Sequence, residues 1–462
     1  MFLQRYYLEC LSHASYMVAD EKTKVAAVID PRRDVEIYLN DAAEHGFKIK
    51  HVILTHFHAD FIAGHIELRD KLGAQIYLGR RAEAEFEFKA LGDGSIIALG
   101  DVRLEAMETP GHTPEGITLL AFDPNSDEQN PYAISTGDTL FLGDVGRPDL
   151  LASIGISANE LAEMLYDSLH KKLLKLPGKT LVYPAHGAGS MCGKALSDEV
   201  VSTLEEQRRF NYALQPMAKA DFIKMMVAEQ SEAPPYFVHD AILNRKERPS
   251  LDKTMQKSMK ALDLESVLSL QDSGAQILDV RTANDFAGAH LRGSLNIGID
   301  GRYATWAGTL LNKDRPIIII SEPEHVEEAI IRLGRIGFHN VEGYLKDGMQ
   351  ALRDRSNLIL KTQRIMAADV GDLGGEVTII DIRTANEWVE GHIEGSANIP
   401  LNQLTKCIEE VPVSGHVIVH CQGGYRSMIA ASFLEKEGRT NIIDLMGGYS
   451  AWTALQLPTK HR

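Results

Sequence analysis

Short apolar runs recur along the chain, and most of them border loops that contain glycine, proline or histidine. In the first half these runs are Val52–Leu54, Ile117–Ala121, Tyr132–Ile134 and Leu181–Tyr183. Continuous apolar runs of this length predict strands buried on both faces of a sheet. In the second half, strand-like runs at 317–320 and 417–420 precede helical stretches at 327–336 and 427–437. The pattern predicts an α/β chain whose polar groups lie in loops at strand ends.

Histidine and aspartate gather in these loops. The first run is followed by Thr55-His56-Phe57-His58-Ala59-Asp60-Phe61, and this H-x-H-x-D spacing suits zinc, iron or manganese. Other strand-end loops hold His112, Asp138 and His186. A lone histidine before a turn is usually solvated or hydrogen-bonded, but four clusters in this order indicate a metal site. One face of an αββα sandwich collects ligands from distant sequence in this way.

Phe61 distinguishes this loop from that of a two-metal hydrolase. Such an enzyme would continue H-x-H-x-D-H, whereas the side chain of Phe61 cannot coordinate a metal. The departure favours one metal rather than two and argues against ordinary two-metal hydrolysis. The alternative is that two zinc ions are held by His56, His58, Asp60, His112, Asp138 and His186.

The first half resembles the metallo-β-lactamase superfamily, and within it the persulfide dioxygenase branch related to glyoxalase II. The cue for the branch is the run Gly137-Asp138-Thr139-Leu140-Phe141-Leu142-Gly143-Asp144-Val145-Gly146-Arg147-Pro148-Asp149-Leu150. The resemblance implies an N-terminal αββα metallo-β-lactamase sandwich over residues 1–245. It also implies a single Fe(II) per chain, held by His56, His112 and Asp138. Groups that would then orient these ligands or bound water are His58, Asp60 and His186.

Three residues that border the iron motifs are candidates for anchoring the thiol carrier of the substrate: Arg147, Thr113 and Tyr183. Ordinary hydrogen bonding within the loops is the alternative for each of them. Cys192 closely follows the His186 loop, where it is either an accessory thiol or a small packed residue.

The second half contains an internal repeat. Asp279 in the first copy corresponds to Asp381 in the second, and His290 corresponds to His392. The D-x-R and G-H-I-x-G-S-x-N-I elements of these copies resemble the rhodanese (sulfurtransferase) family. The resemblance implies two α/β domains with parallel sheets, an inactive one at 262–353 and an active one at 362–462.

Only the second copy has sulfur chemistry in its strand-to-helix loop, Cys421-Gln422-Gly423-Gly424-Tyr425-Arg426-Ser427. Inward-pointing N–H groups at Gly423 and Gly424, the helix N-terminus and Arg426 would favour the Cys421 thiolate and its persulfide. We therefore expect Cys421 and Arg426 to be catalytic. The first copy has Glu322 and Glu324 in this loop and no cysteine, so we interpret it as silent. An unrelated catalytic role for either glutamate is the alternative.

The charge and cysteine content of the chain indicate which kinds of binding partner and which cellular compartment to expect. There are 48 Lys and Arg against 64 Asp and Glu, a net charge of −16, which disfavours nucleic acid and anionic membranes. No apolar run approaches the length of a membrane span, and residues 1–10 lack the regions of a signal peptide. The 4 cysteines are too few for a disulfide scaffold, so we expect a cytoplasmic enzyme.

The two resemblances together predict linked reactions. The iron site should oxidise a low-molecular-weight thiol persulfide with O₂ to sulfite and thiol, and sulfite should take sulfur from a Cys421 persulfide to give thiosulfate, a route of sulfide detoxification. Glutathione, coenzyme A, bacillithiol and hydrogen sulfide are all possible carriers, and related enzymes suggest a dimer or tetramer. The main alternative is a glyoxalase II-like dinuclear thioester hydrolase with a sulfurtransferase module. A sulfide-sensing protein and a sulfurtransferase with an inert front domain are further alternatives.

Overall fold

Every run that the sequence predicts to be a strand forms one in the computed structural model, which describes residues 1–150, 155–193, 196–197, 199–228 and 233–461. The chain divides into two compact units, which are Met1–Leu251 with Gly334–Gly337, and Asp252–Leu333 with Phe338–Arg462. Among the described residues, no helix is long and apolar enough to cross a bilayer.

Two six-stranded sheets, each with parallel and antiparallel pairs, form the centre of the first unit. The first has the order β1-β2-β3-β4-β5-β6, with strands β1 (Phe2–Leu8), β2 (His13–Ala19), β3 (Val25–Ile29), β4 (Lys48–Ile53), β5 (Gln75–Gly79) and β6 (Lys89–Leu91). The second has the order β12-β11-β10-β9-β8-β7, with strands β7 (Ile96–Ala98), β8 (Arg103–Glu108), β9 (Ile117–Phe122), β10 (Ala133–Gly137), β11 (Leu181–Pro184) and β12 (Ser202–Thr203).

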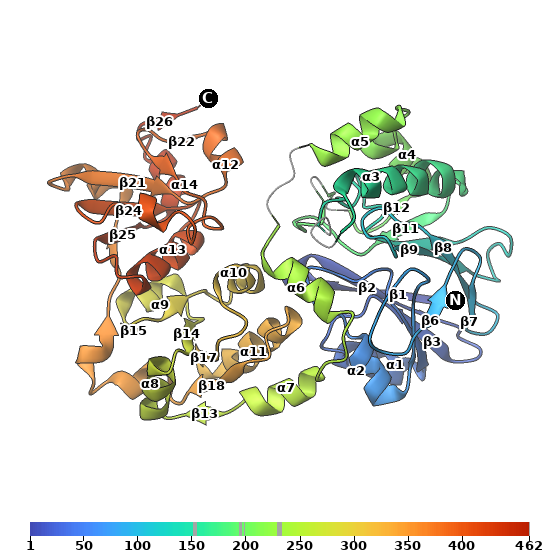
Figure 1. Ribbon diagram of the computed structural model, residues 1–462, viewed down its shortest axis with the longest axis horizontal. Coiled ribbons are helices and arrows are strands. Elements are labelled where there is room, and N and C mark those ends of the chain that lie inside the picture. The colour runs from blue at the N-terminus through green and yellow to red at the C-terminus, as the bar shows by residue number, and fades with distance from the viewer. Residues whose placement is uncertain (151–154, 194–195, 198, 229–232, 462) are drawn as a thin grey trace. The chain divides into compact units, whose positions relative to one another are not determined.

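Helices cover the outer faces of both sheets, and Figure 1 shows α1 and α2 on one side and α3 to α5 on the other. These helices and the one that follows are α1 (Glu36–His45), α2 (His65–Leu72), α3 (Ala158–Asp167), α4 (Leu204–Phe210), α5 (Lys219–Val227) and α6 (Tyr236–Leu243). Side chains such as Ile53 and Leu119 pack between the sheets, and Ile134 packs with Leu165 beneath the helices. The expected αββα sandwich is confirmed.

The sheets bring together the loops that carry the candidate ligands. The strand β10 is parallel to β11, so the loops that carry Asp138 and His186 leave from the same edge of the second sheet. In the first sheet β4 is parallel to β3 and β5, and the loop that carries His56 follows β4. At the end of β10, Gly137 has φ +53, and a Cβ atom there would overlap Oγ1 of Thr55. This close approach requires glycine, and it places Asp138 beside the loop that contains His56.

The second unit contains two modules with the same all-parallel topology, as the repeat predicts. The sheet of the first module has the order β13-β18-β17-β14-β16, with strands β13 (Ala261–Leu262), β14 (Gln276–Asp279), β16 (Leu295–Asn296), β17 (Ile317–Ile320) and β18 (Val341–Leu345). That of the second module has the order β20-β25-β24-β21-β23, with strands β20 (Gln363–Ile365), β21 (Val377–Asp381), β23 (Ala397–Asn398), β24 (His416–His420) and β25 (Ile442–Leu445).

Each module adds a two-stranded antiparallel ribbon, formed by β15 (His290–Leu291) with β19 (Ile359–Leu360) and by β22 (His392–Ile393) with β26 (Thr459–Lys460). The remaining helices are α7 (Leu251–Ser258), α8 (Leu264–Asp272), α9 (Ala283–Gly288), α10 (Tyr303–Leu310), α11 (Val326–Arg335), α12 (Ala385–Glu390), α13 (Tyr425–Lys436) and α14 (Gly448–Ala454). The strand β19 lies between the predicted domain ranges 262–353 and 362–462, and it pairs with β15 of the first module.

Asn244, immediately after α6, holds the loop that contains His58 and Asp60. Its Nδ2 donates to the carbonyl oxygens of His58 and Phe61, both at 2.8 Å, and its Oδ1 accepts from the N–H of Ala63 at 2.9 Å. The side chain is fully buried, so no solvent replaces these partners. Asn244 is far from this loop in the sequence, so these hydrogen bonds are tertiary contacts that clamp the loop in place.

We expect Asn244→Ala to lower the free energy of unfolding of the first unit by roughly 2 to 4 kcal/mol, because buried backbone groups would lose their partners. Thermal and urea unfolding of the full chain would measure the change. The control is Asn125→Ala at an exposed position, where we expect a change within about 0.5 kcal/mol. Equal stability of the two variants would contradict the clamp.

Candidate functional site

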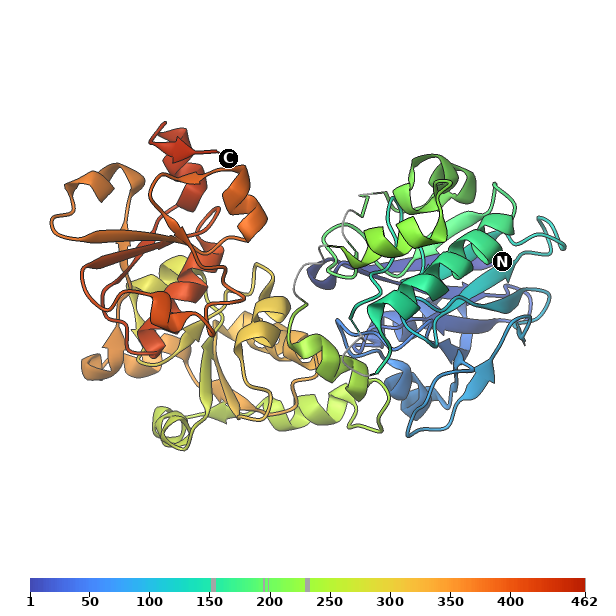
Figure 2. The ribbon, with the colours of Figure 1, turned by 45° about the horizontal axis from the view of Figure 1, so that its top comes forward.

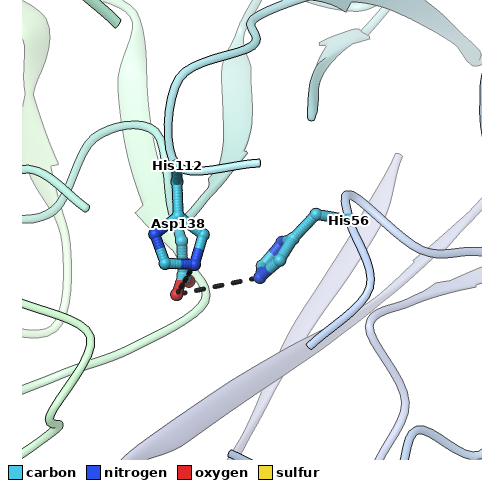
Figure 3. Close-up of side chains that lie close together, drawn as sticks. All are labelled: His56, His112 and Asp138. Carbon is cyan, nitrogen blue, oxygen red and sulfur yellow. Dashed lines mark ion pairs between the residues drawn. The ribbon is translucent and has the colours of Figure 1, made fainter. Parts of the chain in front are cut away.

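Three buried side chains converge on one point of the first unit, and Figure 3 shows both imidazoles directed at the carboxylate of Asp138. Oδ2 of Asp138 lies 3.8 Å from Nε2 of His56 and 3.4 Å from Nε2 of His112. The three ligand atoms lie within 4.8 Å of one another. Among the described residues Oδ2 has no hydrogen-bond partner, although a buried carboxylate oxygen normally has one. The arrangement therefore fits a metal ion held by two imidazoles and one carboxylate.

The other ring nitrogen of each histidine is held by the surrounding structure. Nδ1 of His56 lies 2.9 Å from Oγ1 of Thr55, which donates at 2.8 Å to the carboxylate of Asp30. Nδ1 of His112 lies 2.9 Å from the carbonyl oxygen of Arg147. These contacts leave Nε2 of both rings directed at Asp138, and burial lowers the pKa of both imidazoles, which favours the neutral form that binds metals.

His186 bridges two buried carboxylates. Its Nδ1 lies 2.8 Å from Oδ1 of Asp138, and its Nε2 lies 2.8 Å from Oδ2 of Asp60. Burial alone would lower the pKa of His186, but the two carboxylates outweigh burial and raise it well above the ordinary value. This contact leaves Oδ2 of Asp138 as the atom that faces His56 and His112. The orienting role of His186 and Asp60 stays a prediction.

Aromatic and imidazole rings pack where a two-metal enzyme would have a further histidine. Phe61 is buried with its ring centroid 4.0 Å from that of His13 and 4.4 Å from that of His58. Nε2 of His58 lies 3.1 Å from Oδ1 of Asp30, and the supporting role of His58 stays a prediction.

A second group of possible ligand atoms comes from Asp60, His186 and Cys192, which lie within 4.8 Å of one another. Cys192 is buried, and burial raises the pKa of its thiol well above the ordinary value. Both ring nitrogens of His186 already face carboxylates. This geometry favours metal binding at the first group.

A narrow cavity adjoins the three candidate ligands, and it leaves almost no free space for a molecule the size of water. Its wall includes the hydroxyl-bearing residues Thr55, Thr109, Thr113, Thr136 and Thr139. The Oγ1 atom of Thr113 is buried with no hydrogen-bond partner among the described residues, so its hydrogen-bonding capacity is not used within the described part of the fold. Thr113 therefore borders the candidate ligands, and its contact with the substrate stays a prediction.

The other two residues predicted to contact the substrate, Arg147 and Tyr183, have partners within the fold. Arg147 is buried, and its guanidinium donates two hydrogen bonds of 2.7 Å to the carboxylate of Asp149. Tyr183 is half-buried, and its ring packs edge-on against Tyr16 at 5.4 Å, within the core between the sheets. The structure thus places Thr113 at the cavity, and it gives Arg147 and Tyr183 partners within the fold.

The second unit places Cys421 where β24 gives way to α13. The thiol is buried, and its Sγ accepts a hydrogen bond of 3.1 Å from the N–H of Gly424. Gly424 has φ +109, a conformation that suits glycine and turns its N–H toward the sulfur. Oγ of Ser427 lies 3.8 Å from Sγ. A thiolate or persulfide at Cys421 is therefore stabilised by the loop and by the start of the helix.

Arg426 has a partner that the sequence did not predict. Its guanidinium donates hydrogen bonds of 2.8 and 2.7 Å to the two carboxylate oxygens of Glu387. Burial alone would raise the pKa of Glu387, but Arg426 and the hydrogen bonds from Thr384 together outweigh burial and hold it at about 2. The run Thr384-Ala385-Asn386-Glu387 forms a capping box at the start of α12, and this spacing is the only local sign of where Glu387 lies.

Comparison with known proteins agrees with this architecture. Residues 8–186 match the metallo-β-lactamase superfamily, and residues 263–355 and 367–455 match the rhodanese-like domain. The mitochondrial persulfide dioxygenase ETHE1 of Mus musculus is 33% identical over 218 residues, which cover 46% of this chain and 75% of that protein. A hydroxyacylglutathione hydrolase of Dictyostelium discoideum is 31% identical over 173 residues, which cover 37% of this chain and 61% of that protein.

The crystal structure of a metallo-β-lactamase from Staphylococcus aureus subsp. aureus COL has a TM-score of 0.66 and 30% sequence identity, and the match covers 74% of this chain and 98% of that one. Both the sequence and the fold of the first unit are thus shared with known proteins. The chain belongs to the metallo-β-lactamase superfamily, in the family of the ETHE1 persulfide dioxygenases, and its C-terminal part holds two rhodanese-like domains.

Proposed function

We propose that the first unit oxidises a low-molecular-weight thiol persulfide with O₂ to sulfite and the free thiol. We also propose that Cys421 then transfers sulfane sulfur to sulfite, giving thiosulfate, so that the chain detoxifies sulfide in the cytoplasm. The observation that carries the proposal is the buried group of His56, His112 and Asp138, in which Oδ2 of Asp138 has no other partner among the described residues. The similarity to ETHE1 persulfide dioxygenase supports it.

In the first reaction the protein supplies a set of ligands whose side chains are buried. Fe(II), when bound by these three residues, supplies open positions for O₂ and for a persulfide sulfur. His186 and Thr55 hold the ligands in place, so that little reorganisation is needed. The hydroxyl of Thr113 is available to hydrogen-bond a polar group of the substrate.

In the second reaction the Cys421 thiolate attacks the outer sulfur of a persulfide donor. The S–S bond of the donor breaks, its thiol leaves, and a new S–S bond forms at Sγ. Sulfite then attacks the outer sulfur, the bond to Sγ breaks, and thiosulfate leaves. The N–H of Gly424 stabilises the thiolate that is regenerated. These transfers consume no oxidant.

Thioester hydrolysis is a second candidate function of the first unit, because a hydroxyacylglutathione hydrolase is also among the relatives. A dinuclear hydrolase needs a second metal, and Asp60, His186 and Cys192 are the residues that could hold it. Phe61 and the carboxylates bound to His186 oppose that second site. Metal analysis separates the two functions, since one iron per chain supports the dioxygenase and two metals support the hydrolase.

We expect the Fe(II)-loaded protein to consume O₂ when given glutathione persulfide or coenzyme A persulfide. His112→Ala should lower the rate by more than about a hundredfold, because a ligand is lost. An oxygen electrode measures the rate, and metal analysis of the same samples shows whether iron is lost with it.

The matched control is His45→Ala, which removes an exposed histidine near the end of α1 and should leave both iron content and O₂ uptake unchanged. Absence of uptake by the unaltered protein with any persulfide would overturn the dioxygenase proposal and favour the hydrolase.

We expect Cys421→Ser to lower thiosulfate formation from persulfide and sulfite by more than about a thousandfold, because the nucleophile is removed. O₂ uptake should stay, so sulfite should accumulate and can be measured by chromatography. Cys407→Ser is the control, since Cys407 lies in the same module away from the strand-to-helix loop. Thiosulfate formation that persists in Cys421→Ser would show that another group transfers the sulfur.

A further inference from the structure

The helix that begins at the Cys421 loop packs along the silent module. Figures 1 and 2 show α13 lying over α9, and α13 also contacts β16. The hydroxyl of Tyr425, in the first turn of α13, donates at 2.8 Å to the carbonyl oxygen of Gly298. Two turns later, Oγ of Ser432 accepts at 2.9 Å from the N–H of Asn296. Residues seven apart lie on one face of a helix, so this face is directed at the first module.

The first module forms a socket for the Tyr425 ring. A Cβ atom added at Gly301 would overlap Cζ of Tyr425, so the ring lies directly against the glycine backbone. Arg332 of α11 holds the same segment, because its guanidinium donates to the carbonyl oxygens of Ile299 at 2.6 Å and Gly301 at 3.0 Å. The socket, residues 298–301, is therefore braced from inside the silent module.

Tyr425 is also part of the catalytic loop. It follows Gly424, whose N–H is bonded to Sγ of Cys421, and it precedes Arg426, which is paired with Glu387. A rotation of the backbone at Tyr425 would move both neighbours. The position of the Tyr425 ring thus bears on the hydrogen bond to the thiolate.

We propose that Tyr425 is a positioning residue and that the silent rhodanese-like module is the socket that sets the Cys421 loop. The first module has no cysteine in its own strand-to-helix loop, and its backbone receives Tyr425. It acts through Tyr425 on the N–H of Gly424, and through that N–H on the sulfur. The role rests on the proposed sulfur transfer at Cys421 and explains why a module without a thiol is kept in contact with one that has it.

The test uses the full chain and two variants that disturb the contact from opposite sides. Tyr425→Phe removes the hydroxyl and keeps the ring, whereas Gly301→Ala pushes the ring from the silent module. The readout is the pH dependence of alkylation of Cys421 by iodoacetamide, followed by mass spectrometry of its peptide. We expect the alkylation midpoint to move to higher pH in both variants, because the thiolate loses a well-aligned N–H.

Thiosulfate formation should fall by roughly three- to tenfold in each variant, the range that one hydrogen bond of ordinary strength provides. Because both changes act on one contact, the double variant should lose little more than either single variant. This lack of additivity separates a positioning role from two independent losses of stability.

The matched control lies in the first module. Gly288→Ala adds a methyl group where no atom lies within 4 Å, and it should leave the alkylation midpoint of Cys421 unchanged.

An alkylation midpoint that is unchanged in Tyr425→Phe would overturn the proposal, and this variant decides the outcome if Gly301→Ala does not fold. If the unaltered protein forms no thiosulfate, the proposed sulfur transfer fails, and the alkylation midpoint still decides the role of Tyr425.

Discussion

The imidazole of His186, held between the carboxylates of Asp138 and Asp60, is the contact on which the candidate metal centre depends. It joins the loops that follow β11, β10 and β4, which are distant in the sequence. Buried carboxylates are costly unless they are paired and hydrogen-bonded, and one imidazole satisfies an oxygen of each. The remaining oxygen of Asp138 is then directed at His56 and His112, so the geometry of the site follows from the way in which its buried charge is compensated.

The site is supported by contacts on both of its sides. Asp30 holds Thr55 and through it His56, while Asn244 closes the loop that carries His58 and Asp60. The rings of Phe61 and His13 pack in contact at the position where a further metal ligand would otherwise stand. A packed core responds to changes of a single methylene, so these contacts favour one arrangement of the ligands over its neighbours.

In the second unit two copies of one module share a fold but differ in the residues at the strand-to-helix turn. Both copies keep the parallel sheet and the strand-to-helix turn, but only the second has a thiol in that turn. The turn gathers N–H groups and a helix N-terminus, which favours an anion wherever a nucleophile is present. In the first copy Glu322 and Glu324 occupy this turn, and its backbone at 298–301 instead receives Tyr425 of the second copy. The two copies thus differ at the turn, and the copy without a thiol there contacts the first turn of the helix that follows Cys421.

The sequence by itself determined the strands, the repeat, the αββα and parallel-sheet classes and the loops that carry the candidate ligands, because these follow from local apolar runs and glycine-rich turns. It also singled out His56, His112, Asp138 and Cys421, whose roles stay predictions. Only the tertiary structure decided which residues contact the candidate site residues and their loops. Asp30 contacts His56 through Thr55, and Asn244 holds the loop that contains His58 and Asp60. Glu387 pairs with Arg426, and Gly298 accepts the hydrogen bond of Tyr425. Such partners lie far apart along the chain, and a pattern with a period of two or of 3.6 residues records which face of an element is buried but not what meets it.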